Sequence, residues 1–277
     1  MKSTRSAIEK FDAMFSEGAE LPDDQLSDFL SSALSGINWA RHHSVESYSG
    51  IFWALTRLVG CYERLSVLYE GYAATKADEL CYDAELEIEH LLVRLRVLID
   101  ELAYVIRVCM PPAIRGLSQP KGPGPLQYRQ FSIRELLKFV RKHPDVSTAL
   151  TKLLENNRQD IERFVSRRDD IVHFRAKAII FRTNTMRVGF LDSRLSTSNG
   201  AIEHTDLREF IEPALVWVWR FMQSDLVQYF REEIAVGSLE FDSVGIGPHK
   251  ISMPGSVRLK KLLNTKCRSD ERSDVQD

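Results

Sequence analysis

Long apolar runs, paired cysteines and an excess of charge are all missing from this chain. No stretch of 18 uncharged apolar residues occurs in its 277 positions, which argues against a membrane-spanning helix. The four cysteines form no Cys-x-x-Cys pair, so neither a zinc knuckle nor a disulfide framework is indicated. The 37 basic and 39 acidic residues leave a formal net charge of -2. Such a balance argues against binding nucleic acid or anionic membranes by bulk charge, and any such binding would have to be local.

What remains is the composition of an ordinary globular protein, with 44% hydrophobic and 27% charged residues. The first fifteen residues mix charged with apolar side chains and do not resemble a secretory signal peptide. We therefore expect a cytoplasmic protein with reduced thiols. The sequence contains no Walker loop, GxSxG elbow, dinucleotide fingerprint or metal-ligand spacing, so we expect no cofactor and no metal.

The first half of the chain is predicted to contain two long amphipathic helices. Apolar residues recur at steps of three and four over residues 44–72 and again over residues 88–109. A short polar link around residues 74–79 joins them, while Pro111 and Pro112 end the second helix. This arrangement predicts an antiparallel helical hairpin, the nucleus of a bundle.

Shorter helices are expected after a loop rich in proline and glycine at residues 116–125. Ser132 and Glu135 have capping-box spacing and predict a helix that ends near His143. Two further helices are expected over residues 146–156 and from residue 158 to about 172.

A β-hairpin over about residues 177–191 is indicated by two β-type runs that flank a Thr-Asn-Thr turn. The last long helix is expected over residues 206–235, with a kink near Pro213. Trp217 and Trp219 are expected in the bundle core.

The sequence thus predicts an all-α fold, a helical bundle with a small β-hairpin insertion. We expect one helical domain over residues 1–236 and an irregular segment over residues 237–257. Residues 258–277 are rich in charge and poor in apolar side chains, which predicts a disordered tail.

One charged residue interrupts the apolar stripe of the helix that begins near residue 158. Ile161, Phe164, Val165 and Val172 define the stripe, and Arg168 falls on it, seven residues after Ile161. A buried guanidinium costs several kcal/mol unless it is paired. Either Arg168 meets a carboxylate inside the bundle or this stripe faces a groove.

His173 follows Arg168 by five residues, a rotation of about 140° on a regular helix. The two side chains can share a site only if the helix ends there or a second subunit supplies one of them. The alternative is that His173 merely ends a helix, where an imidazolium favours the negative end of the dipole.

The string Arg168-Asp169-x-x-x-His173 resembles the signature of the HEPN superfamily, an arginine followed after a short spacer by a histidine near the end of a helix in an all-α bundle. Asp169 matches the polar residue that often follows the arginine, and Arg167 offers a second permitted spacing. The motif covers six of 277 residues.

The resemblance implies a metal-independent endoribonuclease, such as a toxin, abortive-infection or antiviral defence protein. It implies a homodimer in which two motifs face each other, an RNA substrate, and a possible antitoxin or regulatory protein as partner. No membrane is implied. Some members have lost activity, so the alternative is a catalytically inactive helical module that binds a partner protein or a nucleotide.

The residues themselves suit the implied chemistry. His173 can move a proton near neutral pH, and Arg168 can clamp a phosphate and stabilise developing negative charge. Asp169 lies one turn before His173 and could orient its ring or raise its pKa. With RNA supplying its own 2′-hydroxyl as nucleophile, no metal is required.

Local charge supports an RNA-binding surface around this motif. Residues 158–187 contain eight basic and four acidic residues, a net charge of +4 in a chain that is -2 overall. Within this segment Arg167, Arg175 and Lys177 are the candidate RNA-binding residues. Such a patch would steer phosphate to the motif.

Overall fold

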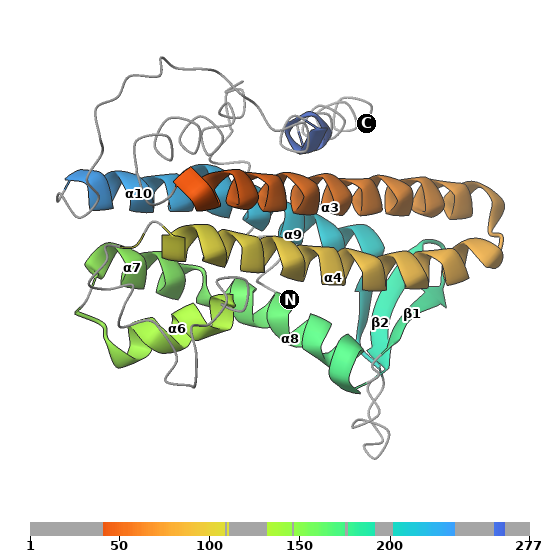
Figure 1. Cartoon of the computed structure of the whole chain (residues 1–277). Coiled ribbons are helices and arrows are strands. Elements are labelled where there is room, and N and C mark those ends of the chain that lie inside the picture. Colours follow the sequence, from red (N-terminus) through yellow and green to blue (C-terminus); the bar gives the residue numbers. More distant parts are fainter. Residues whose placement is uncertain are drawn as a thin grey trace, which may run out of the picture.

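A computed structural model describes residues 41–108, 110, 132–145, 147–174, 177–191, 202–235 and 258–263. Its spine is an antiparallel pair of long helices, α3 (Arg41–Thr75) and α4 (Glu79–Val108), which lie side by side in Figure 1. Their apolar stripes face inward, so that Leu58 of α3 and Leu98 of α4 are fully buried. The predicted helical hairpin is confirmed.

The link between these helices is only three residues long. Lys76 has a φ of 56°, the left-handed conformation that ends many helices, and its N–H donates to the Tyr72 carbonyl at 2.8 Å. This residue ends α3 and begins the turn between the two helices. α4 can then begin at Glu79.

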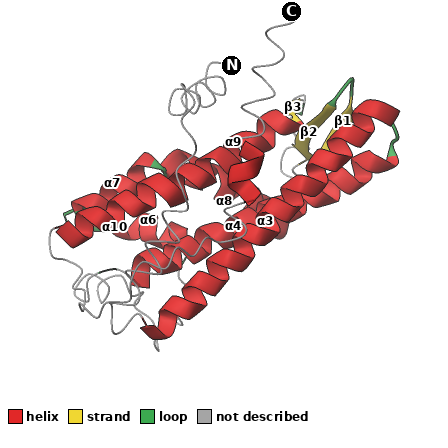
Figure 2. Cartoon of the chain, turned by 90° about the horizontal axis from the view of Figure 1, so that it is seen from above, coloured by secondary structure: helices red, strands yellow, loops and turns green. Residues whose placement is uncertain are grey.

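The remaining helices pack around this hairpin. Figures 1 and 2 show the small sheet at one end of the hairpin, with α7 and α10 at the other. α8 packs on α4, and α10 packs on α7. The all-α fold with a small β insertion is therefore confirmed. These helices are α6 (Ile133–Lys142), α7 (Thr148–Asn156), α8 (Arg158–Phe174), α9 (Leu207–Arg220) and α10 (Leu226–Ala235).

A turn of π-helix, Phe221–Asp225, separates α9 from α10. Pro213, where the sequence predicts a kink, lies inside α9, and α9 continues for seven residues beyond it. The departure from α-helical geometry is instead at Phe221–Asp225, which no Gly or Pro marks. Trp217 and Trp219 are 3% and 2% exposed, which confirms them as core residues.

The cap of α6 differs from the prediction. The Ser132 side chain makes no capping hydrogen bond, so the predicted capping box with Glu135 is wrong. Instead, Asp100 of α4 accepts a hydrogen bond from the Ile133 N–H through Oδ1 at 3.2 Å. A carboxylate from a neighbouring helix has replaced the local cap, which spacing along the chain cannot reveal.

The sheet has three antiparallel strands in the order β1-β2-β3, one more than predicted. The expected hairpin is confirmed, with Ile180 opposite Val188. Its turn lies against the end of α3, where the Tyr72 hydroxyl donates to the Thr183 carbonyl at 3.2 Å. β3 is too short to show an alternating pattern in the sequence. The strands are β1 (Lys177–Arg182), β2 (Met186–Leu191) and β3 (His204–Asp206).

The outer edge of β1 is covered by two carboxylates from α4. Glu89 accepts a hydrogen bond from the Ala178 N–H at 3.2 Å, and Glu85 accepts one from the Ile180 N–H at 2.8 Å. The two glutamates are four residues apart and so share one face of α4. Their spacing matches the two-residue repeat of outward N–H groups on the strand.

Gly189 in β2 has no room for a side chain. A Cβ there would come within 2.7 Å of a Phe181 ring carbon and 3.1 Å of the Glu203 carbonyl oxygen. We expect Gly189→Val to lower the free energy of unfolding by about 1 to 3 kcal/mol through overpacking, measured by urea denaturation. Leu191→Val at the exposed end of the same strand is the control, and equal stability of the two variants would contradict the prediction.

Residues 258–263 form a short helical segment that lies against α3 and is seen end-on in Figure 1. Leu259 is fully buried, Leu263 is 7% exposed, and Arg258 forms an ion pair with Glu63 of α3. These six residues do not fit the disordered tail predicted from residue 258. Their two leucines lie four residues apart and make one apolar face, which the charged composition of the region hides. The segments 116–125, 237–257 and 264–277 lie outside the described residues.

Candidate functional site

The HEPN-like motif lies in the last turns of α8. Arg168 and His173 are both on helical backbone, because α8 continues to Phe174. They are therefore about 140° apart around the helix axis, and one α8 does not bring them to a common face. The side chains of Arg167, Arg168 and His173, and the whole of Arg175, lie outside the described residues.

The buried stripe of α8 is present as predicted up to Val165. Ile161, Phe164 and Val165 are each at most 2% exposed. Position 168 continues this face. In Figure 1, α8 slants away from α4 toward its C-terminal end.

Asp169, the third predicted catalytic residue, is held by a residue that the sequence did not identify. Its Oδ2 accepts a hydrogen bond from Arg134 Nη1 of α6 at 3.1 Å. The Asp169 side chain is 19% exposed, so this ion pair is partly shielded from solvent. Arg134 precedes Asp169 by 35 residues, and no local pattern could have connected them. The contact places a second guanidinium beside the motif.

The net positive charge around the motif is smaller than the +4 counted over residues 158–187 of the sequence. Arg158 pairs with Glu155 as well as with Glu162, and Arg182 pairs with Asp78 at 3.1 Å. Glu155 and Asp78 lie outside the segment that was counted, so the count missed the acids that neutralise it. Lys177 is exposed at the start of β1.

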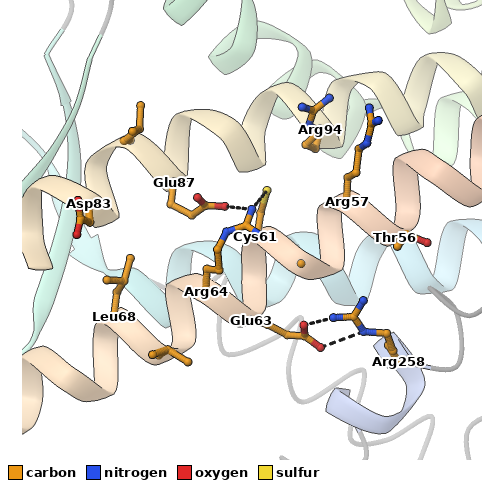
Figure 3. Close-up of a pocket in the computed structure, with 13 residues that line it drawn as sticks. Thr56, Arg57, Cys61, Glu63, Arg64, Leu68, Asp83, Glu87, Arg94 and Arg258 are labelled. Atoms are coloured by element: carbon orange, nitrogen blue, oxygen red, sulfur yellow. Dashed lines mark hydrogen bonds and ion pairs between the residues drawn. The ribbon is translucent and has the colours of Figure 1, made fainter.

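A second feature, not anticipated from the sequence, is a groove on the α3–α4 hairpin, with Arg258 at its rim (Figure 3). Its volume is about 1020 Å³. We call it the arginine groove because four arginines line it together with three acids. The arginines are Arg57, Arg64, Arg94 and Arg258, and the acids are Glu63, Asp83 and Glu87. Nothing in the spacing of these residues distinguishes them from ordinary solvated helix positions.

A buried thiol and an ion pair form the floor of the arginine groove. Arg64 Nη2 lies 2.5 Å from Glu87 Oε1 and 3.3 Å from the Cys61 sulfur. Burial raises the pKa of Cys61 to about 12, and the neighbouring Glu87 adds to the rise although Arg64 and Arg94 oppose it. The thiol therefore stays protonated at neutral pH and is a poor nucleophile.

Glu87 stays ionised in this position. Burial by itself would raise its pKa, but hydrogen bonds from Arg64 and Cys61 outweigh that effect, so its pKa is lowered from the ordinary value. Arg64 and Glu87 are thus a charged pair whose net charge is zero.

Within the described segments, no group of three or more His, Cys, Asp or Glu side chains could hold a metal ion. Cys61 and Cys81 are free and buried. In the part of the chain that the structure describes, no helix is both long and apolar enough to cross a membrane.

Comparison of the chain with protein-family models, with curated proteins and with solved structures gave no match.

Proposed function

We propose that this chain is a metal-independent endoribonuclease of HEPN type that acts in the cytoplasm as a toxin or phage-defence effector. The observation that carries the proposal is the string Arg168-Asp169-x-x-x-His173 in the last turns of a helix within an all-α bundle. An antitoxin or another regulatory protein is the partner expected to restrain such an activity.

The proposed reaction uses groups already present in RNA and in the motif. His173 takes the proton from a 2′-hydroxyl, whose oxygen attacks the adjacent phosphorus while the bond from phosphorus to the 5′-oxygen breaks. A second His173, or the same one after protonation, gives a proton to the leaving oxygen. Arg168 binds the phosphate oxygens as negative charge develops on them. The products are a 2′,3′-cyclic phosphate and a 5′-hydroxyl.

Arg134 is a positioning residue in this scheme. By holding the Asp169 carboxylate, it restricts the direction in which Asp169 can accept a hydrogen bond from the His173 ring. The ion pair of Arg134 and Asp169 carries no net charge. The net positive charge at the motif would then come from Arg167, Arg168 and the exposed Lys177.

Assembly as a homodimer is part of the proposal. Because a regular helix separates Arg168 from His173 by about 140°, two copies of α8 can present four motif side chains to one groove where one copy cannot. We expect light scattering at micromolar concentration to give twice the 31.8 kDa mass of one chain. A monomer that retains RNA cleavage would contradict this arrangement.

Cleavage is expected to survive excess EDTA, since the proposed reaction uses no metal. The 3′ ends of the products should carry cyclic phosphate or phosphate, which end-group analysis on denaturing gels distinguishes from a 3′-hydroxyl. Activity that is lost in EDTA and restored by Mg²⁺ or Mn²⁺ would point to a different mechanism.

A second candidate function is a helical module without catalysis. The arginine groove favours it, because this groove is lined by α3, α4 and Arg258 and by no residue of the motif helix. Such a module would bind a nucleotide or a partner protein and leave RNA intact. Incubation of total RNA with the purified chain separates the two candidates directly.

A further inference from the structure

Two arginines of the arginine groove have no acidic partner among the residues that the structure describes. Arg57 of α3 is exposed and Arg94 of α4 is partly buried. In the view of Figure 3 both guanidinium groups are at the end of the groove away from Asp83 and point the same way. Across the described segments of the chain, neither makes a hydrogen bond or an ion pair.

The other arginines of the groove are neutralised. Arg64 pairs with Glu87, and Arg258 pairs with Glu63. The remaining acid, Asp83, lies at the opposite end of the groove from Arg57 and Arg94 in Figure 3. The positive charge is therefore concentrated at one end.

Such a pair of like charges favours the binding of an anion. Two neighbouring guanidinium groups repel each other, and a bound anion removes that repulsion while gaining attraction from both. Guanidinium groups match the oxygens of phosphate with two parallel hydrogen bonds. A phosphomonoester carries between about -1.5 and -2 charges at pH 7, so it balances two arginines better than a carboxylate or a phosphodiester, each with one charge.

The rest of the groove could hold the organic part of a phosphate ester. Leu68 lies at the end away from the two arginines in Figure 3, and Val67 and Leu86, which are 70% and 56% exposed, also line the groove. The volume of about 1020 Å³ is at the upper end of the range typical of small-molecule sites. Apolar side chains in this position can contact a base or another flat organic group.

We propose that the arginine groove binds the terminal phosphate group of an organic phosphate, with Arg57 and Arg94 as its ligands. Two sources share this chemistry, a free nucleotide and the 5′-phosphorylated end of an RNA. The proposal does not rest on ribonuclease activity, because no residue of α8 lines the groove.

The proposal is tested by measuring ligand binding to the full chain, with ATP and adenosine as one pair of probes. A second pair is a short single-stranded RNA with either a 5′-phosphate or a 5′-hydroxyl, used with the His173→Ala chain to avoid cleavage. We expect ATP to bind and adenosine to bind at least tenfold more weakly. The double variant Arg57→Ala/Arg94→Ala should lose about 10- to 100-fold in affinity for ATP or for the 5′-phosphorylated RNA. Arg231→Ala, which removes an exposed arginine from α10, is the matched control and should bind as the wild type does.

Gly60 offers a second, independent variant. A Cβ there would meet only Arg64 Nη1 at 3.5 Å, an ordinary contact, so the side chain of Gly60→Leu would extend into the groove without displacing backbone. We expect this variant to keep or raise the melting temperature, because glycine weakens the middle of a helix, and to lose phosphate-dependent binding. Gly60→Ala should be at least as stable as the wild type and should bind ATP nearly as well.

The outcomes separate the sources. ATP binding without preference for the 5′-phosphorylated RNA identifies a free nucleotide, and preference for the 5′-phosphate over the 5′-hydroxyl identifies an RNA end. The proposal is overturned if neither phosphate probe binds, or if both RNAs bind equally and ATP does not bind. It is also overturned if the double variant and folded Gly60→Leu bind as tightly as the wild type.

Discussion

Substitution of His173 by alanine is expected to slow RNA cleavage by about 10²- to 10⁴-fold, because it removes the group that moves the proton of the attacking hydroxyl. Arg168→Ala should cause a loss of comparable size, since charge on the transition-state phosphate is then uncompensated. Both rates are best measured on a fluorescent RNA under single-turnover conditions, so that chemistry is separated from product release.

Thermal melting of the same proteins distinguishes a catalytic role from a structural one. If the two residues line a solvated groove, both variants should unfold within about 0.5 kcal/mol of the wild type. Gln159→Ala, an exposed position on the same helix, should change neither rate nor stability. If Arg168 instead pairs with a carboxylate inside the bundle, its removal should cost roughly 3 to 5 kcal/mol. Early melting of both variants with unchanged cleavage by the folded fraction would refute the site assignment.

The largest effect on stability is expected at Asn157, which joins α7 and α8 to the other side of the bundle. This side chain is 1% exposed. Its Nδ2 donates to Asp225 Oδ2 at 2.9 Å and to the Leu153 carbonyl at 3.0 Å. Its Oδ1 accepts from Trp217 Nε1 at 2.9 Å and from Arg220 Nη2 at 3.3 Å. One amide thus satisfies partners in α7, in α9 and in the π-helical turn.

Asn157→Leu removes the hydrogen-bond partner of the buried Trp217 N–H and of the Asn157-bonded Leu153 carbonyl, while Arg220 and Asp225 keep their ion pair with each other. Each stranded group costs about 1 to 3 kcal/mol, so we expect a total loss of roughly 3 to 5 kcal/mol. For a chain of this size that corresponds to a melting temperature lowered by about 6 to 20 °C. Calorimetry or circular dichroism measures the shift.

Asn156→Ala is the matched control for this prediction. Asn156 is the preceding residue and is exposed, so its replacement should move the melting temperature little. Similar melting of the two variants would mean that the hydrogen bonds of Asn157 contribute no more to stability than an ordinary surface side chain.

Much of the fold could be predicted because its information is local. The three- and four-residue steps of α3 and α4 and the polar link between them gave the helical hairpin, and the Thr-Asn-Thr turn gave β1 and β2. The errors have one physical origin, which is a contact between residues distant in sequence. Asp100 displaced the local cap of α6, and buried Leu259 and Leu263 ordered a segment that its charge alone would leave unfolded.

The candidate site, too, could be predicted only where the information is local in the sequence. The motif could be located on α8 because Arg168 interrupts an apolar stripe, but the partner of Asp169 comes from α6 and could not be foreseen. The arginine groove was missed for a different reason. Arg57 and Arg94 look like ordinary solvated helix positions until the packing of α3 against α4 brings them together without an acid.

The two glutamates beside β1 also limit how copies of this chain can associate. Because Glu85 and Glu89 already accept hydrogen bonds from two outward N–H groups of β1, an incoming strand would have to displace two carboxylates to pair there. The opposite edge is β3, only three residues long. The sheet therefore offers little for a strand from a second copy to join, so we expect the proposed homodimer to use another surface than the edges of the sheet.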